Sequence, residues 1–237
     1  MAYSLPNWYK EKRLEFEGHF SSICDERHRI AKKGSVSTSP SGRFGLEIAV
    51  YSTGTDASIP SWEYSRGLVR RTSDGVVLAD IKRNFGHFPF AWAKQEEREY
   101  LICGEDYQGY AVIDPAEGRT NVYVPDEAIK GSGFCWAEIQ PSPNGRCLLV
   151  DGCYWAADYE LRLYDFSTPL DLPLQKLASL SYLFGDPYRD SIQLNGRWTD
   201  DTHVELTAEV VKDGSKASEK STRIWPLQEI LGRVSRA

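Results

Sequence analysis

The sequence predicts an all-β fold, arranged as a stack of about four antiparallel sheets with four strands each. Short runs rich in aromatic and β-branched residues recur along the 237 residues, and segments rich in Gly, Pro, Asn and Asp separate them. Several runs alternate apolar and polar residues with a period of two, which is the pattern of a half-buried strand. A two-sheet β-sandwich also has strands between regularly spaced turns and is the alternative architecture.

The first unit lies in the N-terminal third. Residues 1–12 are expected to be a loosely ordered lead-in, and residues 14–20 a first strand, because apolar residues alternate there with charged ones. Residues 21–33 are polar and are expected to form a loop or a single helical turn. Further strands are expected at residues 35–38, 46–51, 62–71 and 76–81, with a hairpin turn at residues 73–75.

The clearest unit spans residues 134–166. Its aromatic first run ends at residues 141–145 (PSPNG), where Asn-Gly is a tight-turn signal that tolerates positive φ. Residues 147–150 are almost continuously apolar, which indicates a central strand covered on both faces. After a loop, residues 159–165 alternate with a period of two. These features predict three consecutive strands.

The remaining segments repeat this organisation. Strands are expected at residues 90–93, 99–103, 107–113 and 121–124, near 174–180, and at 192–198, 203–211 and 222–225. Residues 226–234 predict a short helix with Pro226 in its first turn. Leu227, Ile230 and Leu231 would lie on one face of that helix.

Two pairs of segments show that the units are related. Residues 39–43 (SPSGR) and 142–146 (SPNGR) have nearly the same sequence, and an apolar strand follows each. Residues 90–93 (FAWA) match residues 134–137 (FCWA), which lie 44 residues further along. A repeat of about 40–50 residues with four strands is typical of propeller blades. At these segments the chain resembles WD40-like and TolB-type β-propeller repeats, and this resemblance implies a propeller-like fold without indicating a function.

We expect a single all-β domain over residues 1–237. Its units are expected at approximately residues 35–85, 90–130, 134–180 and 192–226, followed by the short C-terminal helix. The second and fourth units lack the Ser-Pro-x-Gly-Arg turn, and four units would make a very small ring. The sheets are therefore expected either to close such a ring or to form an open, curved stack.

The net charge of −6 argues against nonspecific nucleic-acid binding and would favour a basic partner through long-range steering. No apolar run reaches the length of about 18 residues that a membrane span needs. The N-terminal segment lacks the apolar region of a secretory signal. Five cysteines at irregular spacing fit reduced thiols in a cytoplasmic protein.

The sequence predicts no catalytic residue, no metal site and no cofactor. It contains no Gly-x-Ser-x-Gly turn for a nucleophile, no Walker loop and no dinucleotide fingerprint. Cys24 and His28 are four residues apart, but no second pair with metal-ligand spacing accompanies them. The enzymatic alternative is a hydrolase that uses loop carboxylates with His87 or His203.

The loops after the second strand of each unit are expected to emerge on one side of the assembly. They combine aromatic and acidic residues, and large rigid aromatic side chains dominate the energetics of interfaces. The residues expected on this binding face are Trp62, Tyr64, Glu105, Asp106, Tyr107, Tyr154, Trp155, Asp158 and Tyr159. Trp92 and Trp136 lie inside strands and are expected to belong to the core.

These observations favour a non-enzymatic intracellular protein that binds another protein. The acidic charge favours a basic partner, as for an immunity protein that neutralises a bacterial toxin. The alternatives are the hydrolase described above and a structural module of a larger assembly. Nothing in the sequence indicates the oligomeric state.

Overall fold

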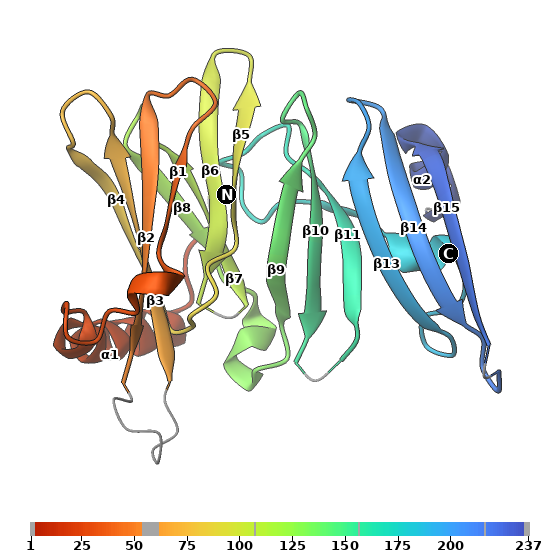
Figure 1. The fold of residues 1–237 in the computed structure, drawn as a ribbon, viewed down its shortest axis with the longest axis horizontal. Helices are drawn as coiled ribbons and strands as arrows, with labels where there is room; N and C mark the ends of the chain where they lie inside the picture. Colours follow the sequence, from red (N-terminus) through yellow and green to blue (C-terminus); the bar gives the residue numbers. More distant parts are fainter. Residues whose placement is uncertain (1–2, 54–61, 107, 156, 216, 235–237) are drawn as a thin grey trace.

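The structure is a computed structural model that describes residues 3–53, 62–106, 108–155, 157–215 and 217–234. Over these residues the chain forms four separate antiparallel sheets and two α-helices (Figure 1). The sheets follow one another in chain order across the molecule. The predicted all-β stack is confirmed, and the two-sheet sandwich is wrong.

Each sheet is a meander in which consecutive strands pair. The first contains β1 (Ser35–Thr38), β2 (Phe44–Ser52), β3 (Glu63–Arg71) and β4 (Val77–Arg83). The second contains β5 (Phe90–Gln95), β6 (Arg98–Glu105), β7 (Gly109–Asp114) and β8 (Arg119–Tyr123). The third contains β9 (Phe134–Pro141), β10 (Cys147–Tyr154), β11 (Tyr159–Asp165) and β12 (Lys176–Ser179). The fourth contains β13 (Ser191–Trp198), β14 (His203–Val211) and β15 (Ser218–Pro226), so its described part has three strands where four were expected.

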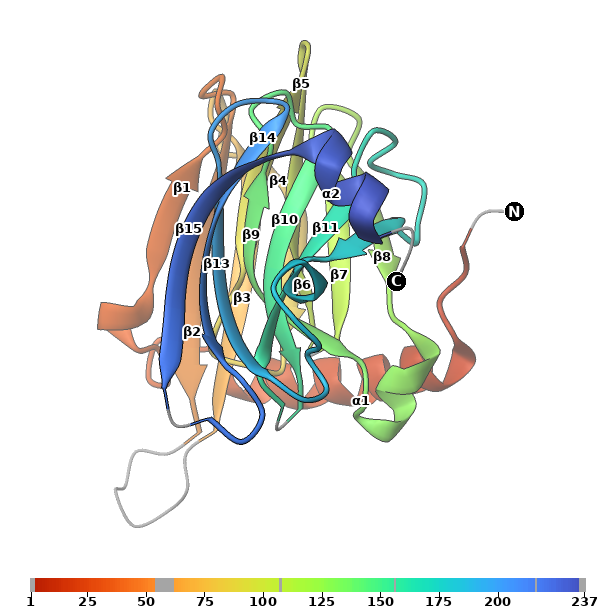
Figure 2. The same ribbon diagram turned by 90° about the vertical axis from the view of Figure 1, so that its right-hand side faces the viewer.

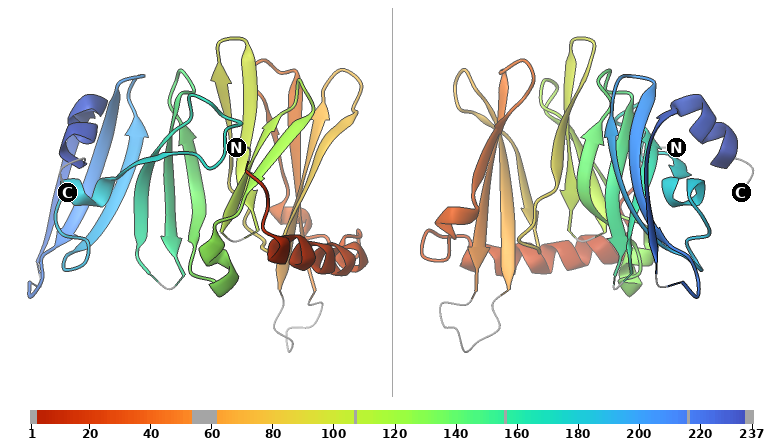
Figure 3. Two further views of the ribbon diagram at one scale, coloured as in Figure 1. Left: turned by 180° about the vertical axis from the view of Figure 1, so that it is seen from behind. Right: turned by 45° about the vertical axis from the view of Figure 1, so that its right-hand side comes forward.

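The N-terminal segment is a helix, so the expected loose lead-in and the expected strand at residues 14–20 are both wrong. Helix α1 spans Asn7–Ile23, and Tyr9, Phe20 and Ile23 are buried along it at helical spacing. Leu14, which the alternating pattern predicts to be a half-buried strand residue, is 73% exposed. Figures 2 and 3 show α1 lying across one end of the first two sheets, which we call the α1 end.

The repeated Ser-Pro-x-Gly-Arg turns have the same structure in both units. Gly42 and Gly145 adopt positive φ values of 76° and 69°, and each donates its N–H to the carbonyl of the serine that opens the turn. The turn between β5 and β6 lacks this signature, and there Glu96 takes the left-handed conformation with a φ of 55°. In each of these three sheets, the turn between the first two strands therefore contains a residue with positive φ.

The core consists of layers between neighbouring sheets. One buried cluster joins the first sheet to the second, one the second to the third, and one the third to the fourth. Helix α2 (Leu227–Val234) buries Ile230 in the last of these layers, as its predicted apolar face requires. Trp136 is buried as expected. No buried cluster of the described residues joins the first sheet to the fourth, so the stack is open (Figure 1).

The two outer faces of the stack carry polar side chains. On the first sheet, Arg66 Nε donates to Asp80 Oδ1 at 2.8 Å. On the fourth, Arg197 Nε donates to Glu205 Oε1 at the same distance. These cross-strand pairs keep the outer faces solvated, as the terminal layers of a stack of repeats require. Neither helix in the described part of the chain is long and apolar enough to cross a membrane.

Candidate binding surface

Helix α1 covers part of the predicted binding face. The Tyr9 hydroxyl donates to Glu105 Oε1 at 2.8 Å, and Arg13 Nη1 lies 3.2 Å from the same oxygen. Glu105 ends β6 and is 5% exposed. Burial raises the pKa of Glu105, and the positive charge of Arg13 opposes this effect. Glu105 therefore ties α1 to the second sheet and is not available to a partner.

Tyr64 lies under the same helix. It is 6% exposed, its hydroxyl is 3.2 Å from His19 Nε2, and the ring of Phe16 stacks on its own ring. The expectation that Tyr64 and Glu105 belong to an exposed loop face is wrong. The reason is that the segment read as a strand is a helix, and this helix packs on the ends of the strands that carry these two residues.

A buried arginine fixes the connector between the first two sheets. Arg83 at the end of β4 is 2% exposed, and its guanidinium donates to the backbone carbonyls of His87 and Asp106. Burial lowers the pKa of Arg83. The Asp106 side chain is itself mostly buried, 3.9 Å from Lys12 Nζ. These contacts hold residues 84–89 against the β6 end, so Asp106 is a structural residue.

The remaining predicted residues divide between two sides of the third sheet. The Tyr154 hydroxyl accepts from Arg162 Nη2 at 2.9 Å, and its ring contacts Phe134, in a hollow of about 360 Å³ between the second and third sheets. Trp155 and Tyr159 instead face the connector 84–89. Asp158 is exposed and lines neither hollow, and Tyr107 lies outside the described residues.

Four exposed aromatic side chains lie at or beside strand ends at the α1 end of the sheets (Figure 1). Trp62, Phe85, Trp155 and Tyr159 are 41%, 37%, 67% and 57% exposed, and we call them the aromatic rim. The rings of Trp62 and Phe85 are 6.3 Å apart, and the Trp62 indole donates to Asn84 Oδ1 at 3.0 Å. Phe85 lies in the connector between two sheets, and no strand or turn pattern marked it in the sequence.

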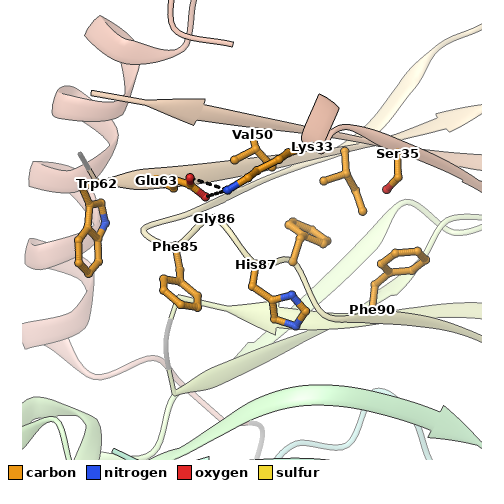
Figure 4. A pocket seen from close by; sticks show the side chains of 11 residues that line it. Lys33, Ser35, Val50, Trp62, Glu63, Phe85, Gly86, His87 and Phe90 are labelled. Carbon is orange, nitrogen blue, oxygen red and sulfur yellow. Dashed lines mark hydrogen bonds and ion pairs between the residues drawn. The ribbon is translucent and has the colours of Figure 1, made fainter. Parts of the chain in front are cut away.

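A hollow of about 650 Å³, which we call the first hollow, lies between the first sheet and the connector 84–89 (Figure 4). Trp62 and Phe85 stand at one end of it, and His87 and Phe90 line its side. Lys33 Nζ donates to both carboxylate oxygens of Glu63, at 2.6 and 2.8 Å. The charges of Lys33 and Glu63 therefore balance each other within the first hollow.

Another hollow, which we call the second hollow, measures about 530 Å³ and lies between the connector 84–89 and strands β9 and β10 of the third sheet. Phe85, Trp155 and Tyr159 of the aromatic rim line it. His87 Nε2 lies 2.7 Å from the carbonyl of Ala137, which joins the connector to β9. The two hollows thus share Phe85 and His87 as lining residues, and we call the two together the recess behind the aromatic rim.

Two cross-strand pairs from β9 and β10 lie on the wall of the second hollow. Cys135 is opposite Cys153, and Glu138 is opposite Asp151. Burial raises the pKa of Cys135 to about 11, which keeps this thiol protonated at neutral pH. Asp151 Oδ1 is buried without a hydrogen-bond partner among the described residues. Burial raises the pKa of Asp151 to about 6, and the negative charge of Glu138 contributes in the same direction.

The structure brings together only some of the groups of the enzymatic alternative: His87 lines the second hollow with Asp151 and Glu138, whereas His203 and Glu105 lie elsewhere. His203 Nδ1 is 3.1 Å from both carboxylate oxygens of Asp200, in a turn of the fourth sheet. His87 is bonded to a backbone carbonyl, and Glu105 lies under α1. Within the described ranges, no three His, Cys, Asp or Glu side chains are placed to hold a metal ion.

No family model matches the chain. A viral protein, "Uncharacterized protein R762" of Acanthamoeba polyphaga mimivirus, is 34% identical over 131 residues, which are 55% of this chain and 50% of that protein. The chain therefore spans about half the length of the curated relative that it matches. The name of this relative assigns no activity.

Two solved structures show a loose likeness. Prolyl oligopeptidase B from Galerina marginata matches with a TM-score of 0.43 and 13% identity over 84% of this chain and 27% of that one. TolB from Acinetobacter baumannii matches with a TM-score of 0.20 and 9% identity over 80% of this chain and 55% of that one. Both TM-scores are below 0.5.

Proposed function

We propose that this protein is a binding module that recognises another protein through the aromatic rim. The observation that carries this proposal is the grouping of Trp62, Phe85, Trp155 and Tyr159 around one recess, each between 37% and 67% exposed. Large aromatic side chains are enriched at the energetic centres of protein interfaces, where they fill or flank pockets. A contiguous exposed group of this kind is more informative than single exposed apolar residues.

The rim is also held in position before any partner arrives. The Trp62 indole is bonded to Asn84, and the connector that carries Phe85 is fastened by Arg83 and His87. A surface ordered in this way loses little conformational entropy on association, which favours tight binding. Phe85 therefore offers a partner a rigid contact rather than a mobile one.

The charge of the chain supports a basic partner. A net charge of −6 steers positively charged proteins toward the surface. Neutralisation of a basic toxin, as by an immunity protein, is the specific form of this proposal that the charge favours. In that form the aromatic rim would supply most of the affinity, and the charge would raise the rate of association.

The proposal is tested by capture from native lysate with three baits. The double variant Trp155→Ala, Asp158→Lys removes one rim residue and reverses an exposed charge beside it. Tyr188→Ala is the matched control, because Tyr188 is 87% exposed and lines neither hollow of the recess. We expect the partner to be retained by the wild type and the control, and to be depleted at least ~10-fold with the double variant.

Urea denaturation should show that the double variant is as stable as the wild type within about 0.5 kcal/mol, because both side chains are exposed. Capture of the same proteins at the same level by all three baits would refute the aromatic rim as the binding surface.

A further inference from the structure

We propose that the second hollow receives an arginine side chain of the partner, with the guanidinium beside Asp151 and Glu138 and against the rings of Phe85, Trp155 and Tyr159. The inference rests on the proposed function and specifies the chemistry of the same surface. It is carried by the contents of the hollow: a carboxylate with one buried oxygen that lacks a hydrogen-bond partner among the described residues, a second carboxylate opposite it, and three aromatic side chains.

Asp151 lacks a counter-charge within the described part of the protein. Asp151 Oδ1 has no partner among the described residues, no described Lys, Arg or His forms an ion pair with either carboxylate, and Glu138 Oε1 accepts from Gln140 Nε2 at 3.0 Å. Arg83 also lines the hollow, but its guanidinium donates to the carbonyls of His87 and Asp106. A partly buried carboxylate without a cation is unfavourable, so a cationic ligand would relieve a cost that the free protein bears.

The walls of the hollow favour a guanidinium over other cations. A planar guanidinium stacks on aromatic rings and pairs with carboxylates through two parallel N–H bonds, whereas an ammonium is a compact and strongly hydrated charge. A divalent metal ion is a poor fit, because the described residues place no third ligand beside the two carboxylates. Cys135 and Cys153 are paired thiols whose pKa values burial raises, so they add apolar surface without charge at neutral pH.

The titratable and charged groups around Asp151 are Glu138, Cys135, Cys153, Tyr159, His87 and Arg83. Arg83 is committed to backbone carbonyls, and raised pKa values keep both thiols neutral at neutral pH. The guanidinium of Arg83 keeps its positive charge, and the two carboxylates outweigh this single charge, so the hollow is negative near neutral pH. An anionic ligand would be repelled there.

The test uses short peptides and therefore does not need the natural partner. N-acetyl-Gly-Arg-Gly-amide is titrated into the protein, and the indole N–H signal of Trp155 is followed by NMR after assignment with Trp155→Phe. The same peptide with citrulline, which has the shape of arginine without its charge, is the matched ligand. A third peptide has lysine in place of arginine. We expect the arginine peptide to bind at least ~10-fold more tightly than the citrulline peptide and at least ~3-fold more tightly than the lysine peptide.

Asp151→Asn should lower the affinity for the arginine peptide at least ~10-fold and leave the affinity for the citrulline peptide unchanged. Asp158→Asn is the control, since Asp158 is an exposed carboxylate near the hollow that does not line it, and it should change binding less than ~2-fold. Equal binding of the arginine and citrulline peptides, or an equal effect of the two variants, would overturn the inference. Equal binding of the arginine and lysine peptides would overturn the stacked geometry.

The two proposals fail separately. If the double variant of the rim loses its partner in the capture experiment but the arginine peptide does not bind, the rim is the binding surface and the arginine site is refuted. If the arginine peptide binds in the hollow but the double variant captures the same proteins as the wild type, the proposed function is refuted while the chemistry of the hollow stands.

Discussion

Replacing Asp151 by asparagine should make the folded protein more stable at neutral pH while it weakens binding. The two side chains have nearly the same shape, so the substitution changes the charge of the hollow and little else. Asp151 Oδ1 is buried without a described partner, and burial raises the pKa of this carboxyl to about 6. The ionised form is therefore disfavoured in the folded state relative to the unfolded chain.

The magnitude follows from the two pKa values. The pKa of Asp151 is about 6 in the folded protein, in place of the ordinary 3.8. Ionisation of this carboxyl is therefore less favourable in the folded state than in the unfolded chain by about 3 kcal/mol. Because the side chain is only partly buried, solvent screening reduces this to about 1–2 kcal/mol. Since the pKa is raised by folding, protonation stabilises the folded state. That contribution is fully present below about pH 4 and is lost as the pH rises through about 6.

The assay is urea denaturation of the wild type and Asp151→Asn at pH 3.5, 5.0, 6.5 and 7.5. The two proteins should have nearly equal free energies of unfolding at the lowest pH. The variant should become more stable by about 1–2 kcal/mol at the highest. Asp158→Asn, a change at an exposed site, should stay within about 0.5 kcal/mol of the wild type throughout. A difference that does not depend on pH, or a variant that is less stable at pH 7.5, would refute the reasoning.

Two further predictions concern the scaffold. Gly145→Ala should destabilise the fold by about 2–4 kcal/mol, because a Cβ there would meet the backbone carbonyl of Lys94 at a φ of +69°. Gly42→Ala, in the equivalent turn with open space around it, should cost about 1 kcal/mol, and equal losses in thermal denaturation would contradict this account. Tyr9→Phe removes the hydroxyl that donates to buried Glu105 and should lower the free energy of unfolding by about 1–3 kcal/mol. The loss is measured as a shift in the midpoint of urea denaturation. An unchanged midpoint would show that this hydrogen bond does not hold α1 on the second sheet.

Much of the architecture could be predicted from local patterns. Residues 203–211 alternate with a period of two, and β14 (His203–Val211) has those bounds. The turn at residues 142–146 was identified because Asn-Gly tolerates positive φ, and Gly145 adopts it. The short C-terminal helix was predicted from its apolar face, and Ile230 is buried. Each of these features depends on residues within a few positions of one another.

The candidate site was less predictable for a physical reason. Trp155 and Tyr159 were identified from their loop, and the structure places both on the aromatic rim. Phe85 was missed because it lies in a connector, where no periodicity exists to mark it. The sequence predicts a loop at Asp151, whereas this residue lies in β10 opposite Glu138, and its raised pKa depends on its burial and on the charge of Glu138 from the neighbouring strand.

The sequence by itself determined the strands, the tight turns and the repetition of a β unit, because hydrophobic periodicity and the φ preferences of Gly, Asn and Pro act over short stretches of chain. Only the tertiary structure decided that the stack stays open, that α1 covers Tyr64 and Glu105, and that one connector joins two hollows behind the aromatic rim. These features depend on which surfaces meet after the chain has folded. Burial, desolvation and charge at Asp151 arise from that meeting and have no local signature in the sequence.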